Sequence, residues 1–310
     1  MSNFRKANNI VGWIVFAISA IVYLLTIEPT ASFWDCGEFI ATAFKLEVGH
    51  PPGAPLFMMI ARLFALFAPD VTKVAALINS MSALASAFTI LFLFWTITHL
   101  ARKLIVGNSY TTSTGQLIAI LGSGAVGALA YTFSDTFWFS AVEAEVYAMS
   151  SLFTAFVFWA ILKWEEQADE AHSTRWIIFI AYVMGLSIGV HLLNLLTIPA
   201  IAFIYYFRKF KTTRNGILTT LAVSAIILGS ILYIIIPGTF KFGSWFDLLF
   251  VNSFGLPYNS GLFFYFVLLF GALAYGIYYS HKKGRVILNT ILVGVTVILI
   301  GYSSYMMILI

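Results

Sequence analysis

Two carboxylates three residues apart are the most chemically suggestive feature of this 310-residue sequence. Asp35 and Glu38 lie in the stretch FWDCGEF, which follows an apolar run long enough to cross a bilayer. Side chains three residues apart share one face of a helix. Partial burial and a neighbouring like charge both raise the pKa of a carboxyl group, which suits a general base. The alternative is an amphipathic helix whose polar face is simply acidic.

A second acidic pair, Glu143 and Glu145, lies in the stretch FSAVEAEVYAMSS. Residues two apart point in different directions on a helix. We therefore expect one carboxylate to face the first pair and bind substrate, while the other meets solvent; a solvated helix entrance is the alternative. The four carboxylates offer the oxygen ligands that a hard divalent cation takes. No ligand spacing supports such a site, so we assign no metal ligand and expect no cofactor.

Two basic side chains follow Asp35 and Glu38 within the same segment. His50 lies in HPPGAP, where the prolines restrict the backbone and could simply make a sharp connection. Its imidazole is suited to binding an anion or relaying a proton. Arg62 lies in the apolar stretch PLFMMIARLFALFA, where it would either extend to lipid headgroups or pair with a phosphate.

Three further residues are weaker candidates for binding substrate. His191 and Asn194 interrupt an otherwise apolar stretch, 176–207, and Tyr147 follows the second acidic pair. All three could line the same pocket as the acids. A buried, hydrogen-bonded structural histidine is an equally good interpretation of His191.

The composition indicates an integral membrane protein. Hydrophobic residues make up 61% of the chain and charged residues 10%, and the mean hydropathy is +0.93. A soluble domain has about 45–50% apolar and about 25% charged residues. The basic residues lie in short clusters between apolar runs, which is typical of membrane topology, so we expect no nucleic-acid partner. The single cysteine, Cys36, excludes a disulfide within the chain.

Apolar runs predict an all-α polytopic membrane protein with about nine transmembrane helices, each of which needs about 20 mostly apolar residues. The expected spans are 10–27, 74–100, 116–133, 146–163, two within 176–207, then 216–236, 261–280 and 286–307. We expect residues 176–207 to form a hairpin of two short helices with His191 near its tip.

Two segments are expected not to span. The first external loop, about 28–71, should carry interfacial helices over 33–46 and 55–68. Phe33, Trp34 and Phe39 would anchor the first of these helices. Residues 237–259 form a second, aromatic-rich segment.

The distribution of charge predicts the orientation. With the N-terminus in the cytoplasm, 13 of the 17 basic residues fall on the cytoplasmic side and nine of the 13 acids on the other. The chain ends directly after an apolar run, so we expect residues 1–310 to be a single membrane domain and a soluble C-terminal region to be absent.

Three segments carry a resemblance to a known family. They are EPTASFWDCGEFIATAFKLEVGHPPGAPLF (28–57), FWFSAVEAEVYAMSSLF (137–153) and GLSIGVHLLNLLTIP (185–199). The chain resembles the GT-C superfamily of polytopic glycosyltransferases. Within it, the chain is similar to an uncharacterised-domain family of Bacteroidetes-type bacteria, whose vertebrate relatives are protein O-mannosyltransferases of the endoplasmic reticulum.

The resemblance implies a donor, an acceptor and a base. A sugar, mannose by analogy with the relatives, would pass with inversion from a polyprenyl phosphate to Ser or Thr hydroxyls of exported proteins, on the periplasmic face of a bacterial inner membrane. Asp35 would deprotonate the acceptor and Glu38 would position acceptor or donor, although the two roles could be exchanged. His50 and Arg62 would stabilise the departing phosphate. Besides the lipid-linked sugar and the exported protein, the expected partner is membrane lipid.

Two other functions fit parts of the pattern. An ion- or proton-coupled transporter or a lipid flippase would use the same acids as a relay, and it predicts acids near the middle of spans. A non-catalytic scaffold needs none of them.

Overall fold

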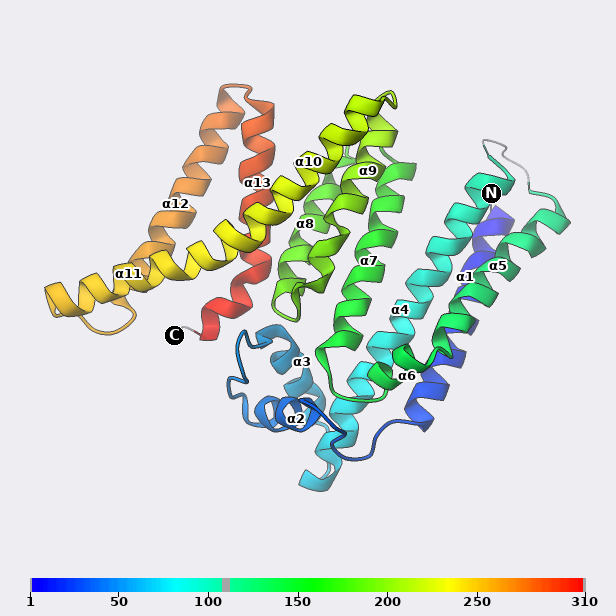
Figure 1. Ribbon diagram of the computed structural model, residues 1–310, viewed down its shortest axis with the longest axis horizontal. Helices are drawn as coiled ribbons and strands as arrows, with labels where there is room; N and C mark the ends of the chain where they lie inside the picture. Colours follow the sequence, from blue (N-terminus) through cyan, green and yellow to red (C-terminus); the bar gives the residue numbers. More distant parts are fainter. Residues whose placement is uncertain (1, 108–111, 309–310) are drawn as a thin grey trace. The chain divides into compact units, whose positions relative to one another are not determined.

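The computed structural model describes residues 2–107 and 112–308. Within those ranges every regular element is a helix (Figure 1), as the apolar runs predict. Seven segments are long and apolar enough to cross a bilayer. Their helices are α1 (Ser2–Leu25), α4 (Val74–Ile105), α5 (Thr114–Thr132), α7 (Val146–Glu166), α10 (Arg214–Ser230) continuing into α11 (Ile236–Phe254), α12 (Ser260–Lys282) and α13 (Val286–Gly301).

The predicted number of about nine spans is not confirmed, and the difference lies in the hairpin of residues 176–207. Its two helices, α8 (Thr174–Ile188) and α9 (Ile198–Lys209), have 15 and 12 residues, whereas a spanning helix needs about 20. The hairpin itself is confirmed. The 3-10 turn η2 (Leu192–Thr197) joins the helices, and His191 lies in this connection.

The chain divides into two compact units, of which the first comprises Met1–Gln167 and Ser187–Asn194. Its central helix is α4, which packs against α1, α5 and α7. Polar contacts also join the helices, since the Tyr23 hydroxyl of α1 donates to the Thr132 carbonyl of α5 at 2.9 Å. The prediction of one functional domain over 1–310 stays a prediction, because compactness does not define a functional unit.

Three short helices lie at one end of this first unit (Figure 1). They are α2 (Cys36–Lys45), α3 (Pro55–Ala65) and α6 (Asp135–Ala141). The first two confirm the prediction of short, non-spanning helices after the first span. Both pack against α4 as well as against each other, so the segment that carries FWDCGEF is fastened to the central helix.

The aromatic residues around FWDCGEF divide into exposed and buried ones. Phe33 and Trp34 are 84% and 87% exposed, as expected of side chains that could meet a membrane surface. The expectation that Phe39 anchors the helix in the same way is wrong. Its side chain is buried, and its ring lies 5.3 Å from the ring of Phe57. The apolar face of α2 turns toward α3, so Phe39 contributes to packing between the two helices.

The second unit comprises Ala168–Leu186 and Leu195–Ile310, and within it α11 packs against α12 and α12 against α13. The helix expected to end near residue 236 continues to Phe254. The expectation that residues 237–259 do not span stays a prediction, because the 41-residue helix Arg214–Phe254 is longer than the roughly 20 residues that one span needs. A π-helical turn, Ile231–Ile235, directly precedes Pro237. Proline within a regular α-helix loses a hydrogen bond and clashes with the preceding turn. The wider π turn relieves both problems, so the helix passes through the proline.

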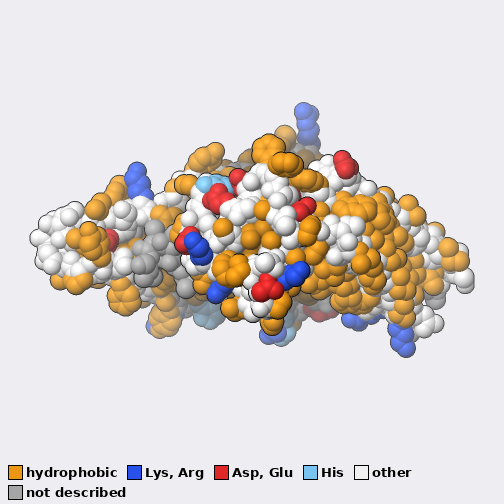
Figure 2. Space-filling model, turned by 90° about the horizontal axis from the view of Figure 1, so that it is seen from below, with side chains coloured by type: hydrophobic (Ala, Val, Ile, Leu, Met, Phe, Trp, Pro, Cys, Tyr) orange, Lys and Arg blue, Asp and Glu red, His pale blue; other side chains and the backbone are white. Residues whose placement is uncertain are grey.

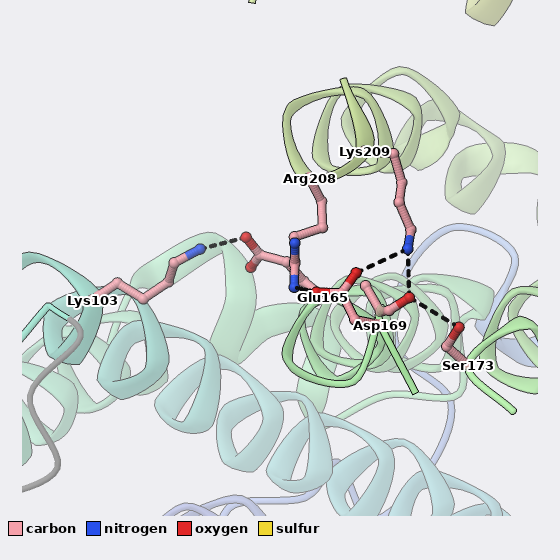
Figure 3. A network of polar contacts seen from close by, with 7 residues as sticks. Lys103, Glu165, Asp169, Ser173, Arg208 and Lys209 are labelled. Carbon is pink, nitrogen blue, oxygen red and sulfur yellow. Dashed lines mark hydrogen bonds and ion pairs between the residues drawn. The ribbon is translucent and has the colours of Figure 1, made fainter. Parts of the chain in front are cut away.

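Acidic side chains in the last turn of α7 and just after it form ion pairs within each unit (Figure 3). In the first unit, Lys103 of α4 forms an ion pair with Glu165 of α7. In the second unit, Asp169 pairs with Arg208 and Lys209 of α9. These exposed pairs contribute little stability individually. They neutralise cations at the ends of two helices, which is where the basic clusters of the sequence lie.

Close packing of α8 against α13 in the second unit generates a test. A Cβ atom on Gly301 would lie 2.4 Å from the Tyr182 carbonyl oxygen and 2.6 Å from the Leu186 nitrogen, whereas one on Gly294 would meet nothing within 4 Å. We expect Gly301→Ala to cost about 1–3 kcal/mol, because backbone atoms cannot yield cheaply. Gly294→Ala should be neutral or stabilising by up to about 1 kcal/mol. Thermal unfolding in detergent measures both, and equal Tm values for the two variants would contradict this packing.

Candidate functional site

Asp35 precedes the first residue of α2 and occupies its N-cap position, but its side chain makes no capping hydrogen bond. Aspartate at this position ordinarily accepts a bond from a backbone N–H group of the first turn. Here a carboxylate oxygen lies 3.9 Å from Nε2 of His50 instead. The side chain is 55% exposed, so it remains accessible to an incoming molecule.

Glu38, in the first turn of α2, is bound on both oxygens by one residue. Oε1 accepts a hydrogen bond from the backbone N–H of His50 at 2.6 Å, and Oε2 lies 3.1 Å from its Nδ1. Gly49 leaves room for this approach, since a Cβ atom there would lie 3.0 Å from Oε1 of Glu38. Gly53, with φ at 73°, then turns the chain back toward α3 in a conformation that favours glycine.

These contacts shift the pKa values of both partners. The hydrogen bond from the backbone N–H of His50, followed by that from its ring, lowers the pKa of Glu38. The hydrogen bond and charge of Glu38 raise the pKa of His50, with smaller contributions from Asp35 and Glu145. His50 is therefore favoured as an imidazolium between two carboxylates. Glu38 is already committed to that contact, which leaves Asp35 as the less engaged acid.

Glu143 and Glu145, in the turn between α6 and α7, are both buried, with 4% and 5% of their surfaces exposed. The expectation that one of them meets solvent is wrong. The Ser32 hydroxyl donates to Glu143, and Glu145 lies close enough to Glu143 and Asp35 for their charges to act on it. A turn replaces the expected helix here, and it directs both side chains inward beneath the loop that leads to α2.

Burial raises the pKa values of Glu143 and Glu145, whereas the contact with His50 lowers that of Glu38. Desolvation, followed by the charges of Glu143 and Asp35, raises the pKa of Glu145 to about 7. Burial also raises the pKa of Glu143, although its bond from Ser32 opposes this. We call Asp35, Glu38, His50, Glu143 and Glu145 the acidic cluster.

The other predicted site residues lie apart from this cluster or serve local contacts. The ring of Tyr147 lies 5.6 Å from the ring of His191, and Nδ1 of His191 accepts a bond from the N–H of Leu193 at 3.1 Å. Asn194 is fully buried and donates to the Ser187 hydroxyl at 2.9 Å. Tyr147 and His191 thus lie side by side, while Asn194 secures the tip of the hairpin. Their roles in binding substrate stay predictions.

Arg62 joins α3 to the end of α2. Its Nη1 donates to the Phe44 carbonyl at 2.6 Å, and its guanidinium carbon lies 5.2 Å from the centre of the Phe44 ring. Both contacts lie at the opposite end of α2 from Asp35. A role for Arg62 in binding the donor phosphate stays a prediction.

The cluster contains a possible metal-binding group that differs from the four carboxylates considered from the sequence. One donor atom each from Asp35, Glu38 and His50 lies within 4.8 Å of the others. Both oxygens of Glu38 already face His50, so a cation would have to compete with the imidazole. The expectation that no metal takes part stays a prediction.

Sequence reasoning missed Asn79 and Ser32. Asn79, in α4, is fully buried and donates to the Glu28 and Thr30 carbonyls at 2.6 and 3.0 Å. The signal was available, because an amide within an apolar span is costly unless it is bonded. Ser32 gave no such signal, since a serine in a polar loop is unremarkable.

Figure 2 shows the face of the molecule seen from below, toward the end at which α2 and α3 lie in Figure 1. Acidic, basic and histidine side chains gather there between broad apolar areas. The apolar helices and the charged groups beside their ends define an integral membrane protein with a polar site at the end of its helices.

Residues 35–214 match the family described as Protein O-mannosyl-transferase TMEM260 N-terminal domain, and the chain belongs to this family. It is 30% identical to Protein O-mannosyl-transferase TMEM260 of Mus musculus over 230 residues, which is 72% of this chain. It is also 30% identical to Protein O-mannosyl-transferase tmem260 of Dictyostelium discoideum over 143 residues, or 46% of this chain. The matches span 29% and 15% of the length of those relatives. No solved structure matches.

The raised pKa of Glu145 predicts how stability changes with pH. Its pKa is about 7 in the folded protein, whereas the ordinary value for glutamate is 4.5. The folded protein therefore loses stability as pH rises from about 4.5 through about 7, because the buried carboxyl group resists ionisation. We expect Glu145→Gln to lose less Tm between pH 5 and pH 8 than the unsubstituted protein. The difference in stability is at most about 3 kcal/mol, at about 1.4 kcal/mol per pKa unit.

Thermal unfolding in detergent at several pH values measures this difference. Glu47→Gln is the control, because Glu47 is an exposed acid in the connection between α2 and α3. Glu145→Gln also removes the small contribution of Glu145 to the raised pKa of His50. This change acts in the same direction, because less of the stability that His50 supplies is then lost as pH rises. Parallel curves for Glu145→Gln and the unsubstituted protein would show that Glu145 does not resist ionisation.

Proposed function

We propose that this chain carries the membrane part of a glycosyltransferase that moves a sugar from a polyprenyl phosphate to Ser or Thr hydroxyls of exported proteins. The sugar is mannose by analogy with the names of the relatives, protein O-mannosyl-transferases. One observation carries the proposal. Asp35, the first residue of the family match, has a carboxylate that is free of any capping bond, exposed and adjacent to a protonatable histidine.

The proposed reaction is a single displacement with inversion, of the GT-C type. The acceptor oxygen attacks the anomeric carbon while Asp35 takes the hydroxyl proton. The bond from that carbon to the donor phosphate breaks, and its electron pair leaves with the lipid phosphate. General bases contribute roughly 10²–10⁴-fold to such reactions. The His50 imidazolium would balance the negative charge on the departing phosphate.

Glu38 has a different role in this scheme. Because both of its oxygens face His50, Glu38 orients the imidazole and favours its charged form. Glu143 and Glu145 are buried, and Glu143 holds the loop before α2 through its bond from the Ser32 hydroxyl. The site would face the periplasm of a bacterial inner membrane, with the N-terminus in the cytoplasm, as the distribution of basic residues favours.

Transport is the competing function, and it predicts acids midway along spans. The acids of the cluster lie in α2 and in the connections before α2 and α7, outside the spanning segments. This position supports group transfer at a membrane surface rather than a relay across it.

Substitution of Asp35 tests the proposed base. We expect Asp35→Asn to lower kcat by about 10²–10⁴-fold, with KM for the lipid-linked donor within about twofold, because the amide keeps the shape but cannot take a proton. The measurement is transfer of labelled mannose from a polyprenyl-phosphate donor to a Ser/Thr-containing acceptor by the full chain in nanodiscs. Glu47→Gln, in the connection between α2 and α3, should leave the rate unchanged.

Glu38→Gln separates the two acids. The amide oxygen can still accept the bond from the His50 backbone, so we expect a smaller fall in kcat than for Asp35→Asn. A normal rate for Asp35→Asn together with an inactive Glu38→Gln would exchange the roles of the two acids. Uptake of substrate by proteoliposomes without any transfer product would support the transporter instead.

A further inference from the structure

We propose that Asn79, in the transmembrane helix α4, is a positioning residue that sets the location of Asp35. This inference deepens the proposed function, on which it rests for its consequence in catalysis. Its structural part concerns the loop between α1 and α2 and can be measured by itself.

The first step of the argument is the cost of Asn79 where it lies. The side chain is fully buried within the second turn of α4, on a face that also carries the small buried residues Ser82 and Ser86. A buried amide without partners costs roughly 1–3 kcal/mol. A buried amide is therefore expected to be hydrogen-bonded, and both the nitrogen and the oxygen of the Asn79 amide have partners.

The partners of Asn79 determine the orientation of its amide group. The nitrogen donates one hydrogen to the Glu28 carbonyl at 2.6 Å and the other to the Thr30 carbonyl at 3.0 Å. The oxygen faces the Cys36 sulfur at 4.0 Å, the distance of a weak S–H donor. Two carbonyl acceptors require an NH₂ group, because neither a carboxylate nor an apolar side chain can donate to them.

Other hydrogen bonds also hold the loop that precedes Asp35. The N–H of Glu28 donates to the Val142 carbonyl at 3.0 Å, and the Ser32 hydroxyl donates to Glu143. Among these anchors, Asn79 makes two bonds from a single side chain of the central helix. It also contacts Cys36, the residue after Asp35. Asn79 therefore contacts the chain both before and after the proposed base.

The consequence is that a spanning helix sets the position of a carboxylate outside the span. A misplacement of about 1 Å at a reacting group can cost about 10²-fold in rate. Loss of the two bonds from Asn79 would leave two carbonyl groups without donors, and the loop would shift to find new ones. Asp35 would then lose its alignment although no group that touches substrate has changed.

Asn79→Asp is the sharpest test, because it preserves shape while it removes both donors. We expect kcat to fall by about 10- to 100-fold, with KM for a polyprenyl-phosphate mannose donor within about twofold. Asn79→Gln keeps both N–H donors on a longer side chain, so its kcat should lie between those of the unsubstituted protein and Asn79→Asp. Ser82→Ala is the matched control, since Ser82 is equally buried in α4 and its hydroxyl has no hydrogen-bond partner.

Hydrogen–deuterium exchange of the full chain in nanodiscs provides a second readout that does not depend on activity. Asn79→Asp should accelerate exchange in peptides covering residues 28–36 and leave those of α7 unchanged, whereas Ser82→Ala should change neither. If the unsubstituted protein transfers sugar and Asn79→Asp has the same kcat, or if exchange over 28–36 is unaltered, the positioning role is wrong and the proposed function stands. If the unsubstituted protein transfers nothing, the proposed function fails, and exchange alone decides whether Asn79 fixes the loop.

Discussion

The need to bond the peptide groups of the loop between α1 and α2 governs the arrangement of this site. Lipid offers no hydrogen bonds, so irregular backbone near a membrane must find its partners within the protein. The protein supplies them through buried polar side chains on other segments. Asn79 of α4 donates to the Glu28 and Thr30 carbonyls, and the Ser32 hydroxyl donates to the buried Glu143.

The same constraint separates the acids by role. Two of the four carboxylates in the cluster accept hydrogen bonds, Glu38 from His50 and Glu143 from Ser32, and Glu145 is buried. Asp35 forms no capping bond, although its position on α2 is one at which aspartate commonly caps. The environment also divides their pKa values, since the contact with His50 lowers that of Glu38 while burial raises that of Glu145. Such a division is what a site that transfers a proton requires.

Much of this arrangement could be predicted from the sequence, because the hydrophobic signal in a membrane protein is strong. The apolar runs predicted the long helices of the first unit, the short helices α2 and α3, and the hairpin around His191. The helix expected to end near residue 236 continues past Pro237, because a π turn precedes the proline and local sequence does not reveal such a turn. Phe39 was misread because interfacial and buried aromatic residues look alike until the partner helix is known.

The site was predicted in part for a related reason. The types and spacing of Asp35 and Glu38 pointed to chemistry, but spacing alone could not rank the two acids. Their ranking depends on the contacts of His50 with Glu38, which come from a residue twelve positions away in the chain. Likewise, the separation of Glu143 from solvent depends on a turn in place of a helix between α6 and α7. Contacts between residues distant in the chain decide these points, and no local pattern encodes them.

The central position of α4 connects the membrane fold to the site. One helix packs against α1, α5 and α7, supports α2 and α3, and carries the amide that binds the loop before Asp35. A helix that is internally bonded and packed on several sides is a rigid reference in a bilayer. An exposed carboxylate on a short loop has no such rigidity of its own. In the proposed scheme, the position of the Asp35 carboxylate therefore depends on the packing of a spanning helix. The buried Asn79 of that helix connects the two.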